Sequence, residues 1–242
     1  HRLMCGDSTS ADDVAKLMDG AKADIYLSDP PYGISVVTKK EEMRKGVGGG
    51  GELHFHRQGI GGGRIVKGNN YSPVIGDDTT ETAKASYLLA TNYTKNQIIF
   101  GGNYFTEFLP PKRCWIVWDK KNGENDFADF EMAWTSFDKS ARLFSYLWNG
   151  LAREGSRDVE GAKRLHPTQK PVGLLVNIVE KLCPECDTIL DLFGGSGSTL
   201  IACEQLNRKC FMMELDPHYC DVIIARWEKL TGKNARRITD GL

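Results

Sequence analysis

The segment Asp29-Pro30-Pro31-Tyr32 places a carboxylate, a rigid carbonyl and an aromatic ring directly after a run typical of a buried strand, 23–28. These groups suit the amino group of a planar base, whose nitrogen lone pair is delocalised into the ring. The Asp29 carboxylate and the Pro30 carbonyl can accept hydrogen bonds from the two N–H groups of the amine, which frees the nitrogen lone pair. Tyr32 can stack on the base. The same residues also suit a plain strand-to-loop turn, because Pro-Pro and Tyr-Gly are turn-prone. Both interpretations stay open on this segment alone.

A glycine-rich turn, Phe193-Gly194-Gly195-Ser196-Gly197-Ser198, follows an expected strand (188–193) and opens an expected helix (198–206). Glycines let a turn approach a ligand closely, and the amides at the start of a helix suit polar or anionic groups. The third glycine of a dinucleotide motif and the lysine of a phosphate loop are both missing, which disfavours NAD and Walker-type phosphate binding. Glu214 lies 23 residues after Asp191, where a carboxylate can bind ribose hydroxyls. The turn indicates an adenosine-type cofactor, with a different ligand of an α/β enzyme as the alternative.

The elements that must position these residues follow from apolar patterning. Apolar runs bounded by turn residues predict strands at 23–28, 97–102, 114–118, 132–136, 143–148, 188–193 and 209–214. Helical spacing predicts helices at 10–20, 83–93, 168–182, 198–206 and 218–230. Ser10 is the expected N-cap of the first helix, and Gly20 its expected end. Strands and helices alternate in the last third, so the fold class is α/β with a mostly parallel central sheet flanked by helices.

Residues 34–76 lack this patterning. Ten glycines lie between Gly46 and Gly68, and such a segment has high backbone entropy and little apolar surface to bury. We therefore expect a glycine-rich mobile insertion at 38–72. It is either a lid over the substrate site or a surface insertion without a role. We expect His54 and His56 within it to be solvated.

Composition limits the remaining possibilities. The 242 residues are 40% hydrophobic, the net charge is −1 and the pI is about 6.6. No stretch is long and apolar enough to span a membrane, and no signal peptide is expected. Nucleic acid would not be bound by bulk charge, so phosphate contacts would rest on local clusters. The best of these clusters comprises Arg153, Arg157, Lys163, Arg164 and Lys170.

The seven cysteines are scattered and odd in number, which suggests a reducing, cytoplasmic setting. Cys183 and Cys186 have C-x-x-C spacing, but no second pair is available to complete a zinc site. We therefore expect a turn between a helix and a strand there, and no metal site.

Four separated motifs in one order resemble those of the amino-group-specific DNA methyltransferases that use S-adenosylmethionine. In that family Asp-Pro-Pro-Tyr, as at Asp29–Tyr32, is usual when the target is adenine N6, whereas cytosine-N4 members more often begin with serine. The family's cofactor motif Phe-x-Gly-x-Gly is matched by Phe193, Gly195 and Gly197. The catalytic motif precedes the cofactor motif, as in the circularly permuted β class. The resemblance implies a Rossmann-like methyltransferase fold.

Two further segments resemble cofactor-binding parts of that family. The stretch 166–171, His-Pro-Thr-Gln-Lys-Pro, resembles the motif that holds the methionine end of the cofactor, which implies that Thr168 and Lys170 meet its carboxylate. Gly6-Asp7-Ser8 resembles the stretch that contacts the cofactor's adenine. The cofactor-binding set so implied is Asp7, Ser8, Asp29, Thr168, Lys170, Asp191, Phe193, Gly195, Ser196, Gly197, Ser198 and Glu214. The implied catalytic set is Asp29, Pro30, Pro31 and Tyr32.

The resemblance implies one catalytic domain, 1–242, that methylates adenine N6 in DNA after the base is flipped out of the duplex. Cytosine-N4 methylation, methylation of RNA or of a protein amide, and a non-catalytic DNA- or cofactor-binding module are the alternatives. Family members usually carry a target-recognition region of tens of residues, but only about 18 lie between Trp148 and Leu165. This departure implies relaxed specificity, or dependence on a separate specificity domain or partner. A homodimer would fit the class, and restriction-modification is one of the biological roles it would allow.

Overall fold

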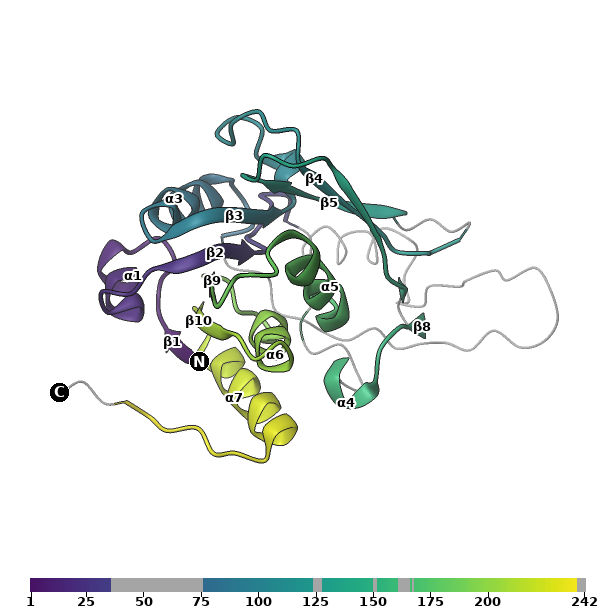
Figure 1. Ribbon diagram of the computed structural model, residues 1–242. Helices are drawn as coiled ribbons and strands as arrows, with labels where there is room; N and C mark the ends of the chain where they lie inside the picture. The colour runs from purple at the N-terminus through teal and green to yellow at the C-terminus, as the bar shows by residue number, and fades with distance from the viewer. Residues whose placement is uncertain (36–75, 124–127, 150–151, 161–165, 167, 239–242) are drawn as a thin grey trace, which may run out of the picture.

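The computed structural model describes residues 1–35, 76–123, 128–149, 152–160, 166 and 168–238 (Figure 1). An eight-stranded sheet runs through its centre in the order β1-β10-β9-β2-β3-β5-β4-β6. Its strands are β1 (Arg2–Cys5), β2 (Ala23–Ser28), β3 (Thr94–Phe100), β4 (Trp115–Asp119), β5 (Phe130–Thr135), β6 (Arg142–Ser145), β9 (Thr188–Asp191) and β10 (Lys209–Glu214).

The sheet is mostly parallel, as predicted. Strands β1, β10, β9, β2 and β3 pair in parallel, whereas β5 runs antiparallel to both β3 and β4. The carboxyl ends of parallel strands meet at one edge of a sheet, so residues far apart in the chain become neighbours there. Cys5 pairs with Glu214, and Asp191 pairs with Met212 one strand further along. This edge therefore collects the ends of β1, β10, β9 and β2.

Helices cover both faces of the sheet (Figure 1). They are α1 (Ala11–Met18), α3 (Glu81–Thr91), α4 (Arg157–Glu160), α5 (Val172–Leu182), α6 (Ser198–Gln205) and α7 (Pro217–Thr231). Successive residues of a strand face opposite sides. In β2, Ile25 and Leu27 belong to the buried cluster that contains residues of α5 and α6, whereas Tyr26 belongs to the cluster that contains residues of α1 and α3. This alternation buries β2 on both faces.

Helix boundaries depart from the predictions where caps and prolines decide them. The predicted N-cap is confirmed, because the Ser10 hydroxyl accepts the Asp13 amide over 3.2 Å. The C-cap of α1 is Asp19, with φ of 46°, rather than Gly20. The prediction that a helix begins at Thr168 is wrong, because Pro171 has extended backbone and α5 begins only at Val172. Helix α3 begins and ends two residues before the predicted 83–93.

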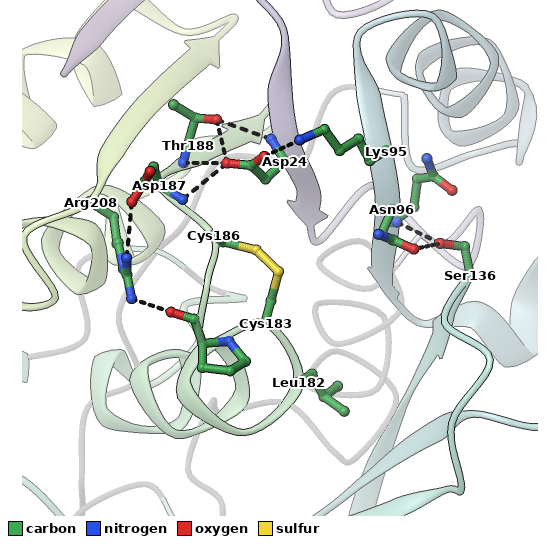
Figure 2. The surroundings of a disulfide bond; sticks show 12 residues. Asp24, Lys95, Asn96, Ser136, Leu182, Cys183, Cys186, Asp187, Thr188 and Arg208 are labelled. Carbon is green, nitrogen blue, oxygen red and sulfur yellow. Dashed lines mark hydrogen bonds and ion pairs between the residues drawn. A yellow bond between two sulfur atoms is a disulfide. The ribbon is translucent and has the colours of Figure 1, made fainter.

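The predicted turn between α5 and β9 is confirmed, and Figure 2 shows Cys183 and Cys186 joined across it by a disulfide, which the sequence did not predict. Asp24 of β2 fastens the end of this turn. Its carboxylate accepts the amides of Asp187 and Thr188 over 3.0 and 3.1 Å. Lys95 of β3 donates to its other oxygen over 2.8 Å. The turn is thus tied to two neighbouring strands.

The predicted strand at 143–148 divides into β6 and the short β7 (Trp148–Asn149), which pairs with β8 (Ala152–Arg153). Beyond β8, the buried Glu160 carboxylate accepts the amides of Val172 and Gly173, over 2.9 and 3.0 Å. This contact ties α4 to the first turn of α5. The insertion at 38–72, His54, His56, Lys163, Arg164 and the side chain of Arg157 lie outside the described residues. Within the described part of the chain, no helix has the length and apolar character needed to cross a membrane.

Candidate active site

Asp29 lies at the carboxyl end of β2, where its carboxylate contacts two hydrogen-bond donors. The Tyr32 hydroxyl donates to Asp29 Oδ1 over 2.6 Å, and the Lys170 ammonium donates to Oδ2 over 2.6 Å. Lys170 Nζ also lies 3.3 Å from the Tyr32 hydroxyl. Pro30, which is buried, and Pro31 interrupt strand pairing, and Tyr32 turns back toward Asp29. The structure thus brings together the first and last residues of the predicted catalytic motif with Lys170 from the segment before α5.

The ring of Tyr32 packs against Gly101, which follows β3. A Cβ built on Gly101 would lie only 2.2 Å from Tyr32 Cε1, and Gly101 has a φ of +70°, so both space and backbone require glycine. Tyr104, in the single-turn helix η1 (Gly102–Tyr104), stacks on Tyr32 with ring centroids 5.1 Å apart. Phe105 meets Tyr32 edge-on at 6.1 Å. The aromatic ring predicted to stack on a base is therefore held by three neighbouring residues.

Lys170 is buried between two carboxylates. Its ammonium lies 2.6 Å from Asp29 Oδ2 and 3.2 Å from Glu131 Oε2. Glu131 belongs to β5, and its other oxygen, Oε1, lies 2.6 Å from the ammonium of Lys120, which directly follows β4. Two carboxylates and two ammonium groups thus alternate in a row, and each buried charge has an opposite neighbour.

The pKa shifts in this row follow from burial and charge. Burial raises the pKa of Asp29, and Lys170 opposes part of that rise. Burial alone would lower the pKa of Lys170, but Asp29 and Glu131 together raise it above the ordinary lysine value. Burial alone would raise the pKa of Glu131, yet Lys170 and Lys120 bring it down to about 2. Lys170 is therefore a fixed cation and Glu131 a fixed anion, whereas Asp29 is the carboxylate that is easiest to protonate.

The predicted cofactor turn lies between β9 and α6. Gly195 and Gly197 adopt left-handed backbone, with φ of +52° and +81°. The three atoms nearest to a Cβ built on Gly195 all belong to His166, at 3.6 Å or more. The Gly195 amide donates to Glu214 Oε2 over 2.6 Å, and burial raises the pKa of the Glu214 carboxyl. The predicted ribose carboxylate thus lies directly against the predicted glycine turn.

Asp191 supports this turn from within the protein. Its Oδ1 accepts the Ser28 hydroxyl over 2.7 Å and the Phe193 amide over 3.0 Å. Asp191 is buried, and burial raises its pKa to about 7 although Thr199 and Ser28 donate hydrogen bonds to it. Asp191 therefore shapes the backbone of the turn and links β9 to β2.

Ser196 and Ser198 are buried under Arg226 of α7. Arg226 Nη1 donates to the Ser196 carbonyl over 3.0 Å and lies 3.4 Å from each serine hydroxyl. Arg226 Nη2 donates to the Val159 carbonyl over 2.8 Å, and burial lowers the pKa of the guanidinium to about 10. The structure thus gives these two serines a contact with the protein, while their predicted contact with a cofactor stays a prediction.

The segment that contains Thr168 adjoins the glycine turn through His166. Thr168 Oγ1 lies 3.1 Å from His166 Nδ1, and the His166 ring packs edge-on against Tyr219 of α7 with centroids 4.6 Å apart. Burial lowers the pKa of His166 to about 4, so its ring is neutral at pH 7. Thr168 therefore contacts the histidine that adjoins the turn, while its implied contact with the cofactor carboxylate stays a prediction. Lys170 is engaged by Asp29 instead, and its contact with a cofactor carboxylate stays a prediction.

The stretch around Asp7 reaches the same edge from β1. The Gly6 amide donates to the Glu214 carbonyl over 3.1 Å. Asp7 Oδ1 accepts both the amide and the hydroxyl of Thr9 over 2.8 Å, and Ser8 is buried. Asp7 is thus next to Glu214 in space, although most of the chain separates them.

The geometry fits an adenosine-type cofactor. Gly195 presents backbone without a side chain, Glu214 supplies a carboxylate for hydroxyl groups, and the phosphate-binding lysine of a nucleotide loop is missing. Within the described residues, no group of three His, Cys, Asp or Glu side chains is arranged to hold a metal ion. The edge therefore carries a carboxylate at Asp29 that suits an amine and a glycine turn at Gly195 that suits such a cofactor.

Several residues of the site did not follow from the sequence: Lys120, Tyr104, Glu131, His166 and Arg226. Tyr104 could have been found, because Gly101-Gly102-Asn103-Tyr104 ends a strand at the same edge as Asp29. Glu131 had a weaker signal, as the single charged residue of β5.

Comparison with known proteins places this arrangement in a family. Residues 23–226 match the N6/N4 family model that is described as DNA methylase. The Type II methyltransferase M2.MboI of Moraxella bovis is 27% identical, over 86% of this chain and 81% of that protein.

Solved structures share the fold. The crystal structure of the M1.HpyAVI–SAM complex has a TM-score of 0.52 at 20% identity and covers 93% of this chain and 98% of its own. The cytosine-N4-specific PvuII DNA methyltransferase has a TM-score of 0.51 at 12% identity, over 97% of this chain and 87% of its own. These likenesses confirm the predicted Rossmann-like methyltransferase fold. Since the family match includes Asp29, Lys170, the glycine turn and Glu214, the chain belongs to the N6/N4 family of DNA methylases.

Proposed function

We propose that this methyltransferase transfers the methyl group of S-adenosylmethionine to the N6 amino group of adenine in DNA. The observation that carries the proposal is the Asp29 carboxylate, which is largely buried at the sheet edge and aligned by Tyr32 and Lys170. An adenine amino group at this point would find a carboxylate acceptor beside an aromatic ring. The identity of residue 29 as Asp supports adenine over cytosine, because cytosine-N4 members of the resembled family more often carry serine there.

S-adenosylmethionine suits the second part of the site, and M1.HpyAVI was solved in complex with SAM. When bound, this cofactor supplies a methyl group on a positively charged sulfonium sulfur. An amine nitrogen can attack the methyl carbon, and the sulfur leaves as a neutral thioether. We assign the ribose hydroxyls to Glu214 and the close backbone approach to Gly195. Thr168 contacts His166, which adjoins this turn, and would contact the methionine end.

In this proposal the enzyme's residues orient the amine and make it nucleophilic. Asp29 accepts an N–H bond and favours pyramidal nitrogen, and Tyr32 supports the plane of the flipped base. Holding the amine and the methyl group together supplies about 7–11 kcal/mol. A hydrogen bond to a charged group contributes about 1.5–3 kcal/mol. Alignment therefore carries most of the rate, and Asp29 adds the share that activates nitrogen.

The test is transfer of tritiated methyl from S-adenosylmethionine to unmethylated double-stranded DNA, with single-stranded DNA and RNA in parallel, followed by nucleoside mass spectrometry. We expect N6-methyl-2′-deoxyadenosine in the DNA digest. N4-methylcytosine would overturn the choice of base, and PvuII shows that the fold accommodates that activity. Label in RNA alone would overturn the choice of nucleic acid. No label anywhere, with cofactor still bound, would favour a binding module or a missing specificity partner.

A further inference from the structure

Both oxygens of the Asp29 carboxylate already accept hydrogen bonds, one from Tyr32 and one from Lys170. The Lys170 contact is the stronger obstacle to an incoming amine, because an ammonium at 2.6 Å withdraws charge from the acceptor that must activate nitrogen. If Asp29 activates an amino group, as in the proposed function on which this inference rests, Lys170 must have somewhere else to place its charge.

Glu131 offers that place. Its Oε2 is buried and lies 3.2 Å from Lys170 Nζ, but it makes no well-aligned hydrogen bond. The opposite oxygen is held by Lys120 at 2.6 Å. Glu131 is therefore fixed on one side and has a buried acceptor directed toward Lys170 on the other. This oxygen has an ion-pair contact but no aligned hydrogen bond, so an ammonium that moved closer and aligned with it would be held more strongly there.

We propose that Glu131 is a positioning residue that draws the Lys170 ammonium from Asp29 when the substrate amino group enters. Lys170 keeps its proton and exchanges one carboxylate for another. Asp29 Oδ2 then accepts an N–H bond of the amine, and the Tyr32 hydroxyl continues to donate to Oδ1. No bond between heavy atoms forms or breaks in this exchange. Lys120 keeps Glu131 in place while Lys170 moves.

The charged and titratable groups around Asp29 determine what removal of Glu131 would do. They are Tyr32 and Tyr104 at the aromatic stack, Lys120 just after β4, Glu131 from β5, His166 and Lys170 from the segment before α5, and Asp191 at the end of β9. Glu131 is the neighbouring anion that raises the pKa of Asp29, and Lys170 lowers it. Without the Glu131 charge, Asp29 is the one anionic partner of Lys170 among the described residues, and the pKa of Asp29 falls.

The test compares Glu131→Gln with the wild-type enzyme in methyl transfer to DNA across pH. We expect kcat to fall between about tenfold and hundredfold, the equivalent of one hydrogen bond to a charged group. KM for DNA and the dissociation constant for S-adenosylmethionine should change much less. The acid limb of the kcat profile should move to lower pH. Glu131→Asp, which keeps the charge, should restore most of the turnover and the wild-type acid limb.

Glu204→Gln is the matched control, because Glu204 has a similarly exposed carboxylate, 25% against 27%, and contacts two basic side chains far from Asp29. It should leave the pH profile unchanged. If Glu131→Gln does not fold, Lys120→Gln serves instead. In that variant Glu131 has lost its contact with Lys120 and pairs with Lys170 only, so it draws Lys170 from Asp29 more strongly. The pKa of Asp29 then rises, and the acid limb should move to higher pH.

Unchanged kcat in Glu131→Gln, or an acid limb that moves to higher pH in that variant, would overturn the exchange. Equal losses in Glu131→Gln and Glu131→Asp would also overturn it, since they would indicate packing rather than charge. Because wild-type turnover is measured in the same assay, failure of the proposed function would appear separately, as absence of methyl transfer by the wild-type enzyme.

Discussion

At the scale of single residues, the Asp29 carboxylate combines burial with two short hydrogen bonds. Removing it takes away the acceptor for the amine and leaves Lys170 with Glu131 as its remaining anionic contact. The glycine turn and Glu214 do not depend on Asp29 for any hydrogen bond in the structure. Loss of Asp29 should therefore affect turnover far more than cofactor binding.

We predict that Asp29→Ala nearly abolishes methyl transfer and leaves S-adenosylmethionine binding weakened but detectable. Single-turnover assays measure the first effect, and titration calorimetry measures the second. Glu180→Ala, an exposed change on α5, controls for general effects of substitution. Wild-type turnover in Asp29→Ala would remove Asp29 from the catalytic site altogether.

At the scale of elements, the end of β3 determines where the Tyr32 ring can lie. Gly101 leaves no space for a side chain, and the positive φ adds strain for any other residue. We predict that Gly101→Ala displaces Tyr32 and lowers kcat about tenfold or more. Gly232→Ala is the control, because Gly232 has the same φ of +70° but no atom within 4 Å of an added Cβ. Gly232→Ala should lose only the stability that its left-handed backbone costs, whereas Gly101→Ala should lose more in urea unfolding because its Cβ has no space. Equal activities would show that Tyr32 tolerates the shift.

The turn between α5 and β9 should carry a pH-dependent part of the stability. Partial burial would raise the pKa of Asp24, but hydrogen bonds from Lys95 and from the Asp187 and Thr188 amides bring it down to about 2. A carboxyl whose pKa is lower in the folded than in the unfolded state stabilises the protein above the unfolded value. This stabilisation is present above pH about 4 and is lost as the pH falls toward 2.

We predict that Asp24→Asn lowers the free energy of unfolding at pH 7 by at most about 2 kcal/mol, and that the difference from wild type disappears near pH 2. Urea unfolding at several pH values measures this. Asp138→Asn is the control, because it removes a 2.8 Å ion pair with Arg113 that is far more exposed than the Asp24 pair. This change should lower the free energy of unfolding by less than about 1 kcal/mol. A loss in Asp24→Asn that stays constant with pH would contradict a charge-based role.

The elements that the sequence predicted well are those whose residues are adjacent in the chain. Asp29–Tyr32, the glycine turn and the Ser10 cap each form one short run, so their local chemistry determines their conformation. Glu131 could not be assigned this way, because its role arises from strand pairing. The antiparallel register sets Glu131 opposite Trp118, and Lys120 lies two residues further along β4's direction. The disulfide and the start of α5 likewise depend on tertiary geometry and on Pro171.

At the scale of the whole molecule, parallel strand order explains how a permuted sequence forms one site. β1 pairs with β10, and β9 pairs with β2, so the C-terminal strands β10 and β9 lie between the N-terminal strands β1 and β2 along the edge. The single catalytic domain at 1–242, the insertion at 38–72, and a homodimer or specificity partner stay predictions. The described part of the stretch between Trp148 and Leu165 is occupied by β7, β8 and α4, and Glu160 and Val159 tie α4 to α5 and α7. Relaxed specificity and dependence on a separate specificity domain or partner both stay predictions.

Cofactor binding should therefore stabilise the molecule as a whole, because its expected contacts come from the ends of β1, β9 and β10 and from the segment before α5. At a hundredfold excess over its dissociation constant, a ligand stabilises the folded state by about 2.7 kcal/mol. For a chain of this size we predict that S-adenosylmethionine raises Tm by about 5–10 °C in thermal unfolding. The Tm of Glu214→Ala should rise less at the same cofactor concentration, because the carboxylate expected to bind the ribose is gone. The Tm of Glu180→Ala should rise as much as that of the wild type. ATP should give little shift in any variant, because the glycine turn has no lysine for phosphates. Equal shifts in Glu214→Ala and wild type would place the ribose elsewhere along the edge.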